Sequence, residues 1–471
     1  MTKAGSRSFS LILPGAAFLI GMFMLTSWMR PEQRSDVTIR IPSGKGAAVQ
    51  KDDRSGERNK GTLIQGKGKP AQDNGIWNQF RGPDRNGIAS DKGLLREFPE
   101  QGPRIIWKKK LGEGHAGPAV YKGRVYVVDY DKDKREDVIR CFSLDNGEDI
   151  WSYSYYVKIK TNHGMSRTIP SVTEKYVVSI GPMCHVTCLD TQTGRLIWKK
   201  DLVKEYGSTV PPWYAGQCPF IEGDSVILGI GGKDVLVMGI DLETGSEKWR
   251  TPNPDKSQMT HSTIVGLTFA GIKQYVYCGS MGIVGVSASD GNVLWKNSSW
   301  RITPANVPTP LIIGKDRILF TAGYGKEGAL MLRLTEEQGK ISYKEEFRLK
   351  IKLFGNEQQT PLLYKDHVYG VISSGEMACI DLNGKQLWKS GRKNRYGIAP
   401  YCIADGMIYV LHDQKGTLHL LEASPEGFKE ITRTRVLHGH DAWAPMALVS
   451  GKLILRDVHD MVCIDVKGGT Q

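Results

Sequence analysis

The sequence contains one short motif whose residue types could hold a metal ion, His438-Gly439-His440-Asp441. Two histidines two residues apart on a strand point to the same face, as neighbouring metal ligands do. No third ligand can be identified, so we interpret these histidines as structural or solvent-exposed side chains. We predict no metal site.

Motifs for covalent or phosphate chemistry are also missing. The sequence has no Gly-x-Ser-x-Gly, no His-Glu-x-x-His and no phosphate-binding loop. The stretch Gly229-Ile-Gly231-Gly232-Lys233 is interpreted as a hairpin turn, because strands rather than a helix follow it. We therefore predict no catalytic residue.

The cysteines indicate buried structural positions rather than bridges or ligands. Cys184 and Cys188 are four residues apart, about 13 Å along a strand, which exceeds the reach of a disulfide. Cys188, Cys379 and Cys463 each precede an aspartate by two residues. This recurrence predicts one small, buried, equivalent position in three repeats.

A repeat organises most of the chain. In five places a glycine precedes a tryptophan by four residues: Gly147/Trp151, Gly194/Trp198, Gly245/Trp249, Gly291/Trp295 and Gly384/Trp388. The tryptophans up to Trp295 are 46 to 51 residues apart, and Gly339/Tyr343 fills the double gap before Trp388. A period in the high forties, with strand-length runs separated by Gly/Asp turns, fits a four-stranded propeller blade.

Two further details support this interpretation. Proline cannot donate a ladder hydrogen bond, and an innermost blade strand is an edge that tolerates it. Seven repeats have a proline near the start of the first strand: Pro118, Pro170, Pro219, Pro310, Pro361, Pro400 and Pro445. Each repeated tryptophan places a large ring on the outer strand, where its burial would dock one blade to the next.

The repeat count predicts how the ring closes. The eighth repeat, from Trp443 to Lys467, has three strands and then the chain stops, whereas Arg104–Lys108 supplies a fourth strand with a tryptophan. We predict an all-β fold, an eight-bladed β-propeller of four-stranded antiparallel blades, with the N-terminal strand completing the last blade.

The N-terminal region predicts a membrane attachment. An apolar run at residues 9–29 follows Lys3 and Arg7, and its length suits a membrane span or a long secretory signal. We divide the chain into an anchor or signal (1–30), a disordered polar linker (31–75) and the propeller (76–471). We favour an uncleaved anchor with the propeller on the extracytoplasmic, periplasmic side; cleavage would make the protein secreted.

The net charge of +13 lies partly in this linker, and no basic run with interleaved aromatic residues occurs. We therefore expect no nucleic-acid partner. We expect a monomeric propeller.

The segments Leu189–Trp198, Ile240–Trp249 and Ile380–Trp388 resemble the tryptophan-docking repeat of PQQ-type propellers. The resemblance covers about residues 104–471 and is weak in the fifth, seventh and eighth repeats. Trp77–Gly87 is similar to the segment that opens many secreted bacterial propellers of this class.

This resemblance implies two kinds of function. Quinoprotein alcohol dehydrogenases use PQQ with calcium on the propeller axis, whereas the propeller lipoprotein of the outer-membrane β-barrel assembly machinery binds no cofactor and acts as a scaffold. This chain lacks the adjacent cysteine pair of many such dehydrogenases and the lipid-acceptor cysteine of the scaffold, and no calcium-ligating set can be placed. The fold therefore does not decide between them.

A binding site is expected where the first strands begin, because these segments converge on one mouth of the axial channel. Polar and aromatic residues occupy this position around the ring: His115, Arg167, Trp213, Gln217, His261, Asn306, Gln358, Tyr396, Asp441 and Trp443. They would supply stacking faces, donors and acceptors to a ligand; alternatively, they satisfy backbone groups of the turns.

We expect a membrane-tethered, extracytoplasmic binding scaffold for a protein or polymeric ligand, without a cofactor. The alternative is a PQQ-dependent alcohol dehydrogenase-like quinoprotein with calcium and an atypical site, in which Asp441 or Glu357 would be the base. A third possibility is a carbohydrate-binding module, suggested by Trp213, Tyr214 and Trp443.

Overall fold

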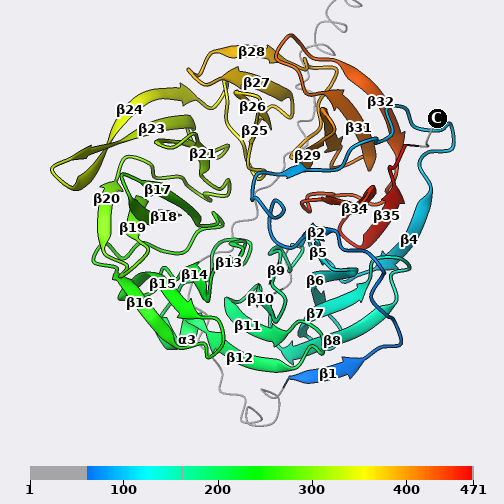
Figure 1. Cartoon of the computed structure of the whole chain (residues 1–471), viewed down its shortest axis with the longest axis horizontal. Helices are drawn as coiled ribbons and strands as arrows, with labels where there is room; N and C mark the ends of the chain where they lie inside the picture. The colour runs from blue at the N-terminus through cyan, green and yellow to red at the C-terminus, as the bar shows by residue number, and fades with distance from the viewer. Residues whose placement is uncertain (1–60, 161–162, 469–471) are drawn as a thin grey trace, which may run out of the picture. The chain divides into compact units, whose positions relative to one another are not determined.

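Eight antiparallel sheets are arranged around an axis in the computed structural model, which describes residues 61–160 and 163–468 (Figure 1). The predicted fold class is confirmed. Six sheets have four strands, and two are widened by extra strands from the N-terminal part. One short helix, α3 (Leu202–Tyr206), begins at Asp201, whose side chain accepts a hydrogen bond from the Lys204 backbone.

The first strand of each sheet lies nearest the axis (Figure 1). These strands are β5 (Ala119–Tyr121), β9 (Ser171–Val172), β13 (Phe220–Glu222), β17 (Val265–Phe269), β21 (Leu311–Ile313), β25 (Leu362–Tyr364), β29 (Tyr401–Ala404) and β33 (Ala447–Val449). The seven repeat prolines all lie one or two residues before such a strand, as the edge argument predicts.

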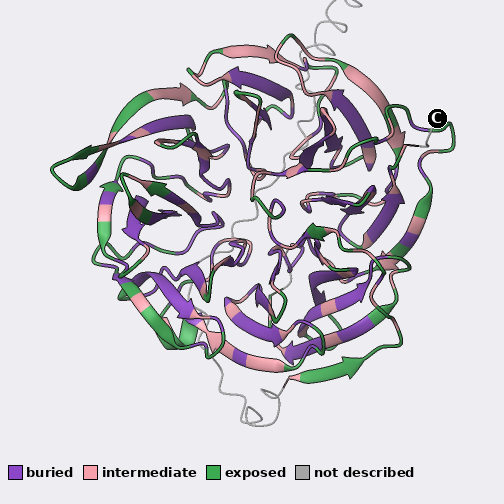
Figure 2. Cartoon of the chain, in the orientation of Figure 1, coloured by how far each residue is buried: buried purple, intermediate pink, exposed green. Residues whose placement is uncertain are grey.

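The second and third strands of each sheet form its centre, and their residues are mostly buried (Figure 2). The second strands are β6 (Arg124–Asp131), β10 (Tyr176–Ile180), β14 (Ser225–Gly229), β18 (Ile272–Gly279), β22 (Arg317–Thr321), β26 (His367–Val371), β30 (Met407–Leu411) and β34 (Lys452–Arg456). The third strands are β7 (Glu136–Ser143), β11 (His185–Asp190), β15 (Val235–Asp241), β19 (Gly282–Ser287), β23 (Glu327–Glu337), β27 (Met377–Asp381), β31 (Thr417–Glu422) and β35 (Asp460–Asp465).

The fourth strands form the outer rim. They are β8 (Asp149–Tyr156), β12 (Leu196–Asp201), β16 (Glu247–Pro252), β20 (Val293–Asn297), β24 (Lys340–Lys350), β28 (Gln386–Lys389), β32 (Glu430–Arg435) and β4 (Ile105–Lys110). The last sheet thus takes its fourth strand from an early part of the chain. β4 pairs with β35 from Lys110 opposite Asp460 to Ile105 opposite Ile464.

The turn between the third and fourth strands explains the repeated glycine. In Asp190–Gly194 the aspartate side chain accepts hydrogen bonds from the Thr193 backbone (2.7 Å) and hydroxyl (2.7 Å). Gly194 has φ +73°, and its backbone N–H donates to the Asp190 carbonyl. Asp241–Gly245 repeats this arrangement, so the Asp-x-x-Thr-Gly pattern encodes the turn.

The same glycine lies against the tryptophan of the preceding sheet, because a Cβ at this position would meet the indole ring. The pairs are Gly147 with Trp107, Gly194 with Trp151, Gly245 with Trp198 and Gly291 with Trp249. The Trp198 Nε1 donates to the Leu242 carbonyl of the next sheet (2.9 Å), and the Trp107 Nε1 donates to the Leu144 carbonyl (2.8 Å). The glycine–tryptophan repeat therefore marks contacts between neighbouring sheets.

Four of the eight cysteines lie where this packing needs a small residue. Cys141, Cys188, Cys379 and Cys463 are each paired across the ladder with a docking tryptophan, and glycine has this place in two other sheets. All eight cysteines are buried and free. The prediction of a small, buried, equivalent position is confirmed.

The predicted start of the propeller at residue 76 is too late. Thr62–Gln65 forms β1, which pairs with the outer edge of β8, and the Asp73 carboxylate accepts a hydrogen bond from Lys452 (2.9 Å). Residues 61–75 therefore belong to the folded unit rather than to a disordered linker. The polar composition misled the prediction, because β1 satisfies its backbone on a strand almost ninety residues away.

The predicted membrane segment at 9–29 and the linker residues up to 60 lie outside the described residues. In the part of the chain that the structure describes, no helix has the length and apolar character that crossing a bilayer requires.

The opening segment, residues 76–89, crosses the axis at the end of the first strands (Figure 1). Its strand β2 (Ile76–Trp77) pairs with β5, and β3 (Ile88–Ala89) runs parallel to the end of β29. Between them, the Arg85 guanidinium donates to the Ile221 carbonyl and lies 4.0 Å from the Phe220 ring centroid. The segment thus joins first strands from different parts of the ring.

Candidate functional site

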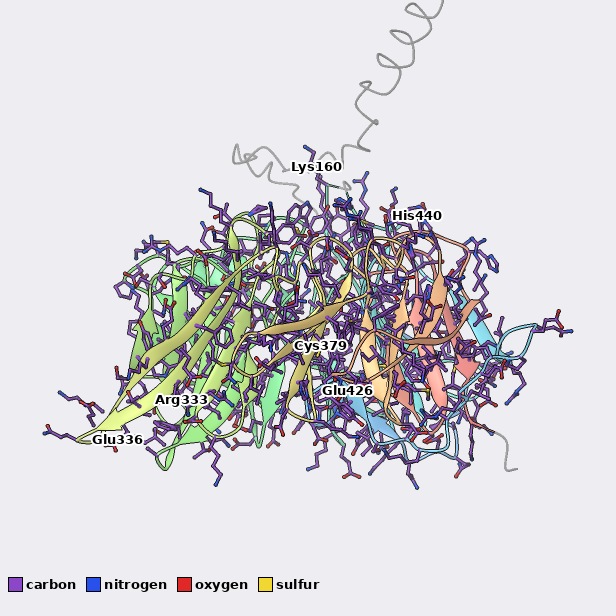
Figure 3. All side chains as sticks on the ribbon, turned by 90° about the horizontal axis from the view of Figure 1, so that it is seen from above. Lys160, Arg333, Glu336, Cys379, Glu426 and His440 are labelled. Atoms are coloured by element: carbon purple, nitrogen blue, oxygen red, sulfur yellow. The ribbon has the colours of Figure 1, made fainter. Side chains whose placement is uncertain are left out.

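The segments that precede the first strands lie at the other end of the axis, and we call them the axial mouth. Figure 3 shows Lys160 and His440, which precede β9 and β33, on one face of the unit, with Glu336 and Glu426 towards the opposite face. The second strands run back towards the mouth, so the connections between second and third strands reach the same face.

His115 and Trp443 form one side of the axial mouth, across the junction of the first and last sheets. Their ring centroids are 4.5 Å apart, and the Trp443 indole is half-buried. His115 is only 4% exposed, and neither ring nitrogen has a hydrogen-bond partner among residues 61–160 and 163–468. Burial, followed by the charge of Arg167, lowers the pKa of His115 well below its usual value, so the ring is neutral at pH 7.

Trp213, His261 and Tyr324 form a second group. The Trp213 ring lies 6.1 Å from Tyr324 and 6.5 Å from His261. Burial and the charge of Arg167 lower the pKa of His261 to about 4. Trp213 and the following Tyr214 both have positive φ, +60° and +76°. Two adjacent strained residues in a loop that presents an aromatic face are typical of binding sites.

Arg167 lies near both groups, because its charge acts on both His115 and His261. Its Nε is buried and has no hydrogen-bond partner in the described part of the chain. Burial lowers the pKa of Arg167 to about 10, which still leaves it charged at neutral pH. Asn306, 2% exposed, lies beside His261, whose backbone N–H donates to the Asn306 carbonyl. Among the residues that the structure describes, neither side-chain amide atom of Asn306 has a hydrogen-bond partner.

Carboxylates lie on another part of the mouth. Burial and then the charge of Asp413 raise the pKa of Glu357 to about 7. Burial would raise the pKa of Asp413, but hydrogen bonds from His412, the Ile398 backbone and Trp443 lower it. Asp441, at φ +53°, accepts a hydrogen bond from Gln414 (2.8 Å).

The structure brings together most of the predicted site residues, with two exceptions. Gln217 is fully buried, and its amide donates to and accepts from the Gly229 backbone, so neither atom is available to a ligand. Tyr396 is 1% exposed and packs edge-on against His419. Gln358 is half-buried, and its side chain lies close enough to Tyr324 to lower the pKa of that phenol by hydrogen bonding.

Sequence reasoning did not find Tyr324 and Asp413. Both lie in the connections between second and third strands, at β22–β23 and β30–β31. The strand order contains the signal for both residues. The first strand leads away from the mouth and the second strand leads back to it, so the residues after the second strand also lie at the mouth. Aligning the residues after the second strands would have identified both.

The motif at His438–Asp441 does not form a metal cluster. The His440 Nδ1 lies 3.0 Å from the Asp441 carboxylate, but the His440 side chain is 66% exposed. No group of three or more His, Cys, Asp or Glu side chains placed to hold a metal occurs among residues 61–160 and 163–468. Calcium takes six to eight oxygen ligands from carboxylates, amides and backbone carbonyls, and the described carboxylates do not gather in threes at any one place.

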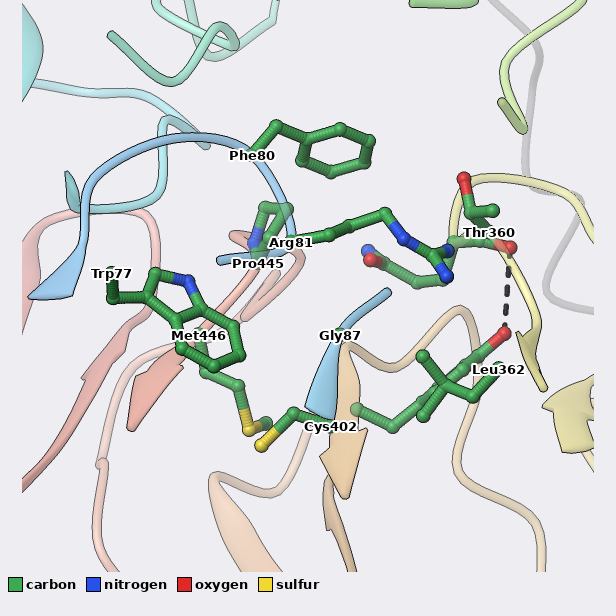
Figure 4. Close-up of a pocket in the computed structure, with 11 residues that line it drawn as sticks. Trp77, Phe80, Arg81, Gly87, Thr360, Leu362, Cys402, Pro445 and Met446 are labelled. Carbon is green, nitrogen blue, oxygen red and sulfur yellow. Dashed lines mark hydrogen bonds between the residues drawn. The ribbon is translucent and has the colours of Figure 1, made fainter. Parts of the chain in front are cut away.

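A cavity lies between the opening segment and the beginnings of the first strands (Figure 4). Trp77, Arg81, Leu362, Cys402 and Met446 are among its lining residues. The Arg81 guanidinium is used in the structure, because it donates to the carbonyls of Pro361, Arg85 and Asn86. This cavity therefore offers a ligand less than the axial mouth does.

Solved structures similar to this chain have the propeller fold at low sequence identity. A europium-containing methanol dehydrogenase has a TM-score of 0.61 at 12% identity, with 81% of this chain and 89% of that chain covered. BamB from Moraxella catarrhalis has a TM-score of 0.53 at 13% identity, with 77% and 99% covered. The quinohemoprotein alcohol dehydrogenase from Comamonas testosteroni has 0.55 at 12%, with 84% and 81% covered.

These likenesses show the fold alone. No curated protein sequence matches the chain. A family model described as outer membrane protein assembly factor BamB matches residues 134–390, more than half of the chain. The chain therefore belongs to this PQQ-like repeat family.

Proposed function

We propose that this protein is a membrane-tethered, extracytoplasmic scaffold that binds a segment of a protein partner at the axial mouth. One observation carries the proposal: the mouth gathers buried polar atoms without a partner beside half-buried aromatic faces. These atoms belong to His115, Asn306, Arg167 and Asp413. Buried polar groups are normally hydrogen-bonded, so such a cluster favours a surface that a ligand completes.

The opening segment supports a mouth at one face only. It crosses the axis, and Arg81 and Arg85 fasten it to the ring through the carbonyls of Pro361 and Ile221. A ligand would therefore approach from the face that carries His440 and Lys160 (Figure 3). The family description, an assembly factor, favours a protein over a small molecule as this ligand.

A photo-crosslinking residue in place of Trp443, in the full chain expressed in cells, tests the proposal. The control places the same residue at Glu426, on the opposite face. We expect a discrete crosslinked protein from position 443 that is absent from position 426 and is lost when Asn306→Ala is added. Equal labelling from both positions would contradict a site at the mouth.

Membrane tethering through residues 9–29 is tested separately. We expect the full chain in the membrane fraction after a carbonate wash, with the propeller cleaved by protease added from the extracytoplasmic side. A chain beginning at residue 61 should be soluble after expression. Recovery of the full chain in the soluble cytoplasmic fraction would contradict the tether.

A quinoprotein dehydrogenase is the second candidate, favoured by the raised pKa of Glu357, about 7, which suits a general base. Turnover of alcohols with PQQ, calcium and an artificial electron acceptor would establish it. We expect no turnover, because no calcium-ligating set of carboxylates and amides can be placed in the sequence.

A further inference from the structure

Three arginines, Arg81, Arg167 and Arg456, have a pKa lowered to about 10 by burial, and a comparison of them singles out Arg167. The Arg81 guanidinium donates to three backbone carbonyls. The Arg456 side chain is fully buried, donates to the carbonyls of Ala116 and Gly112, and lies 3.8 Å from the Asp129 carboxylate. Both are therefore structural residues.

Arg167 differs from both. Within residues 61–160 and 163–468, its guanidinium forms no ion pair with a carboxylate and no hydrogen bond, and its Nε is buried. The groups whose charges act on it are Tyr214 and Tyr324. Burial raises the pKa of Tyr324, so this phenol carries no charge at neutral pH. Arg167 is only partly exposed, and a partly desolvated charge without a counter-ion is unfavourable in a folded protein, a cost that binding sites commonly carry.

The surroundings of Arg167 suit an anion with an adjoining apolar group. His115 and His261 are neutral, so they add hydrogen-bonding atoms without repelling charge, and the Asn306 amide is buried beside them. The Trp213 and Tyr324 rings lie 6.1 Å apart next to this group. A guanidinium fork binds a carboxylate with two parallel hydrogen bonds.

We propose that Arg167 is the anchor for a carboxylate of the bound partner, and that the ligand segment is an acidic peptide with an aromatic or aliphatic residue beside its Asp or Glu. The proposal rests on the proposed scaffold function and specifies the chemistry of its ligand. The carboxylate completes the guanidinium, while the neighbouring side chain packs on Trp213 and Tyr324.

The first test needs no ligand. Thermal unfolding of the full chain is compared for Arg167→Met and Arg456→Met. We expect Arg167→Met to unfold at or above the parent temperature, because the variant removes an uncompensated charge. Arg456→Met should unfold several degrees lower, since it leaves two carbonyls without donors. A loss of the same size in both variants would make Arg167 structural and overturn the proposal.

The second test measures binding of three dye-labelled peptides, with repeats of Gly-Glu-Phe, Gly-Gln-Phe or Gly-Lys-Phe, by fluorescence anisotropy. We expect the Glu peptide to bind about tenfold or more tightly than the other two. Arg167→Met should abolish this difference, and Arg167→Lys should reduce it severalfold because the fork is lost. The control Arg433→Met, at a rim arginine whose side chain is 65% exposed, should keep it.

The other outcomes separate the two proposals. Equal binding of all three peptides would overturn the carboxylate anchor but leave the scaffold function standing. Binding of none would overturn the acidic peptide, while the crosslinking experiment still decides the scaffold. Arg167-dependent binding of oligogalacturonate or of a phosphoserine peptide, without the Glu peptide, would also overturn the assignment.

Discussion

Replacing Gly245 by alanine should destabilise the propeller chiefly through Trp198 of the preceding sheet. The alanine Cβ would lie 2.7 Å from the Trp198 Cγ and 2.8 Å from its Cδ2, distances that force the ring to move. Gly245 also has φ +72°, which costs an L-residue about 1–2 kcal/mol. Overpacking adds about 1–3 kcal/mol, so we expect a loss of roughly 2–5 kcal/mol.

A double-mutant cycle separates these two contributions. Trp198→Ala alone should lower the unfolding free energy by about 3–5 kcal/mol, because the indole is 9% exposed and its Nε1 bonds to the Leu242 carbonyl. In that background Gly245→Ala should cost only the backbone part, about 1–2 kcal/mol. The two substitutions should therefore be coupled by about 1–3 kcal/mol.

The measurement is urea unfolding followed by circular dichroism on the four proteins of the cycle. Gly223→Ala is a matched control in the same sheet, because Gly223 has φ +58° and no atom within 4 Å of its added Cβ. It should show the backbone cost alone. Additive effects in the cycle, or a control as damaging as Gly245→Ala, would refute the docking argument.

Three further predictions concern titration and thiols. Burial and the charge of Arg167 lower the pKa of His261 to about 4, so the folded state binds fewer protons than the unfolded state below about pH 6.5. The free energy of unfolding should therefore fall as the pH drops from about 6.5 to 4. His261→Gln should flatten this dependence when urea unfolding midpoints are measured across the range. Burial raises the pKa of Asp137 to about 6, against a hydrogen bond from Tyr155, so stability should fall as the pH rises from about 4 to 6. Asp137→Asn should therefore raise the unfolding midpoint at pH 8 and change it little at pH 4; a lower midpoint at pH 8 would show that the ionised carboxylate is stabilising. All eight cysteines are buried and free, so a thiol reagent should label none before unfolding and eight afterwards, whereas rapid labelling of the folded protein would contradict the tryptophan–cysteine packing.

The fold could be predicted because each repeat encodes its own structure locally. Asp190–Gly194 specifies a turn from five consecutive residues, and the glycine that ends it also accommodates Trp151 of the preceding sheet. One short pattern therefore determines both the hairpin and the contact between neighbouring sheets. Repetition of this pattern gave the number of sheets without any knowledge of long-range contacts.

The N-terminal additions could not be predicted in the same way. β1 has four residues, all exposed, with no alternation that marks a buried face. Its partner β8 is defined only once the first sheet exists. Arg81 likewise shows no signal in the sequence, because its three carbonyl partners include that of Pro361, 280 residues away.

For the axial mouth, sequence position indicated which residues precede the first strands but not which way their side chains point. Arg167 and Gln217 both precede a first strand by a few residues. Gln217 turns back to bond Gly229, whereas Arg167 lies within electrostatic reach of Tyr214 and Tyr324 and forms no side-chain hydrogen bond among the described residues. The difference depends on the neighbouring sheets, which no pattern within one repeat can report.

The ring separates residues that stabilise the protein from those that would bind a ligand. Backbone groups near the axis are satisfied between neighbouring sheets: the Ser262 hydroxyl donates to the Pro308 carbonyl, and the Thr309 backbone N–H donates to the Thr360 hydroxyl. Tryptophans at the rim complete the inter-sheet contacts. The Arg167 Nε and the Asn306 side-chain amide have no hydrogen-bond partner in the described part of the chain, so we expect substitution of either side chain to change binding with little loss of stability. A propeller built this way can acquire new ligands by changes at the mouth while its rim pattern stays constant, which is why the repeat predicts the fold so well and the function so poorly.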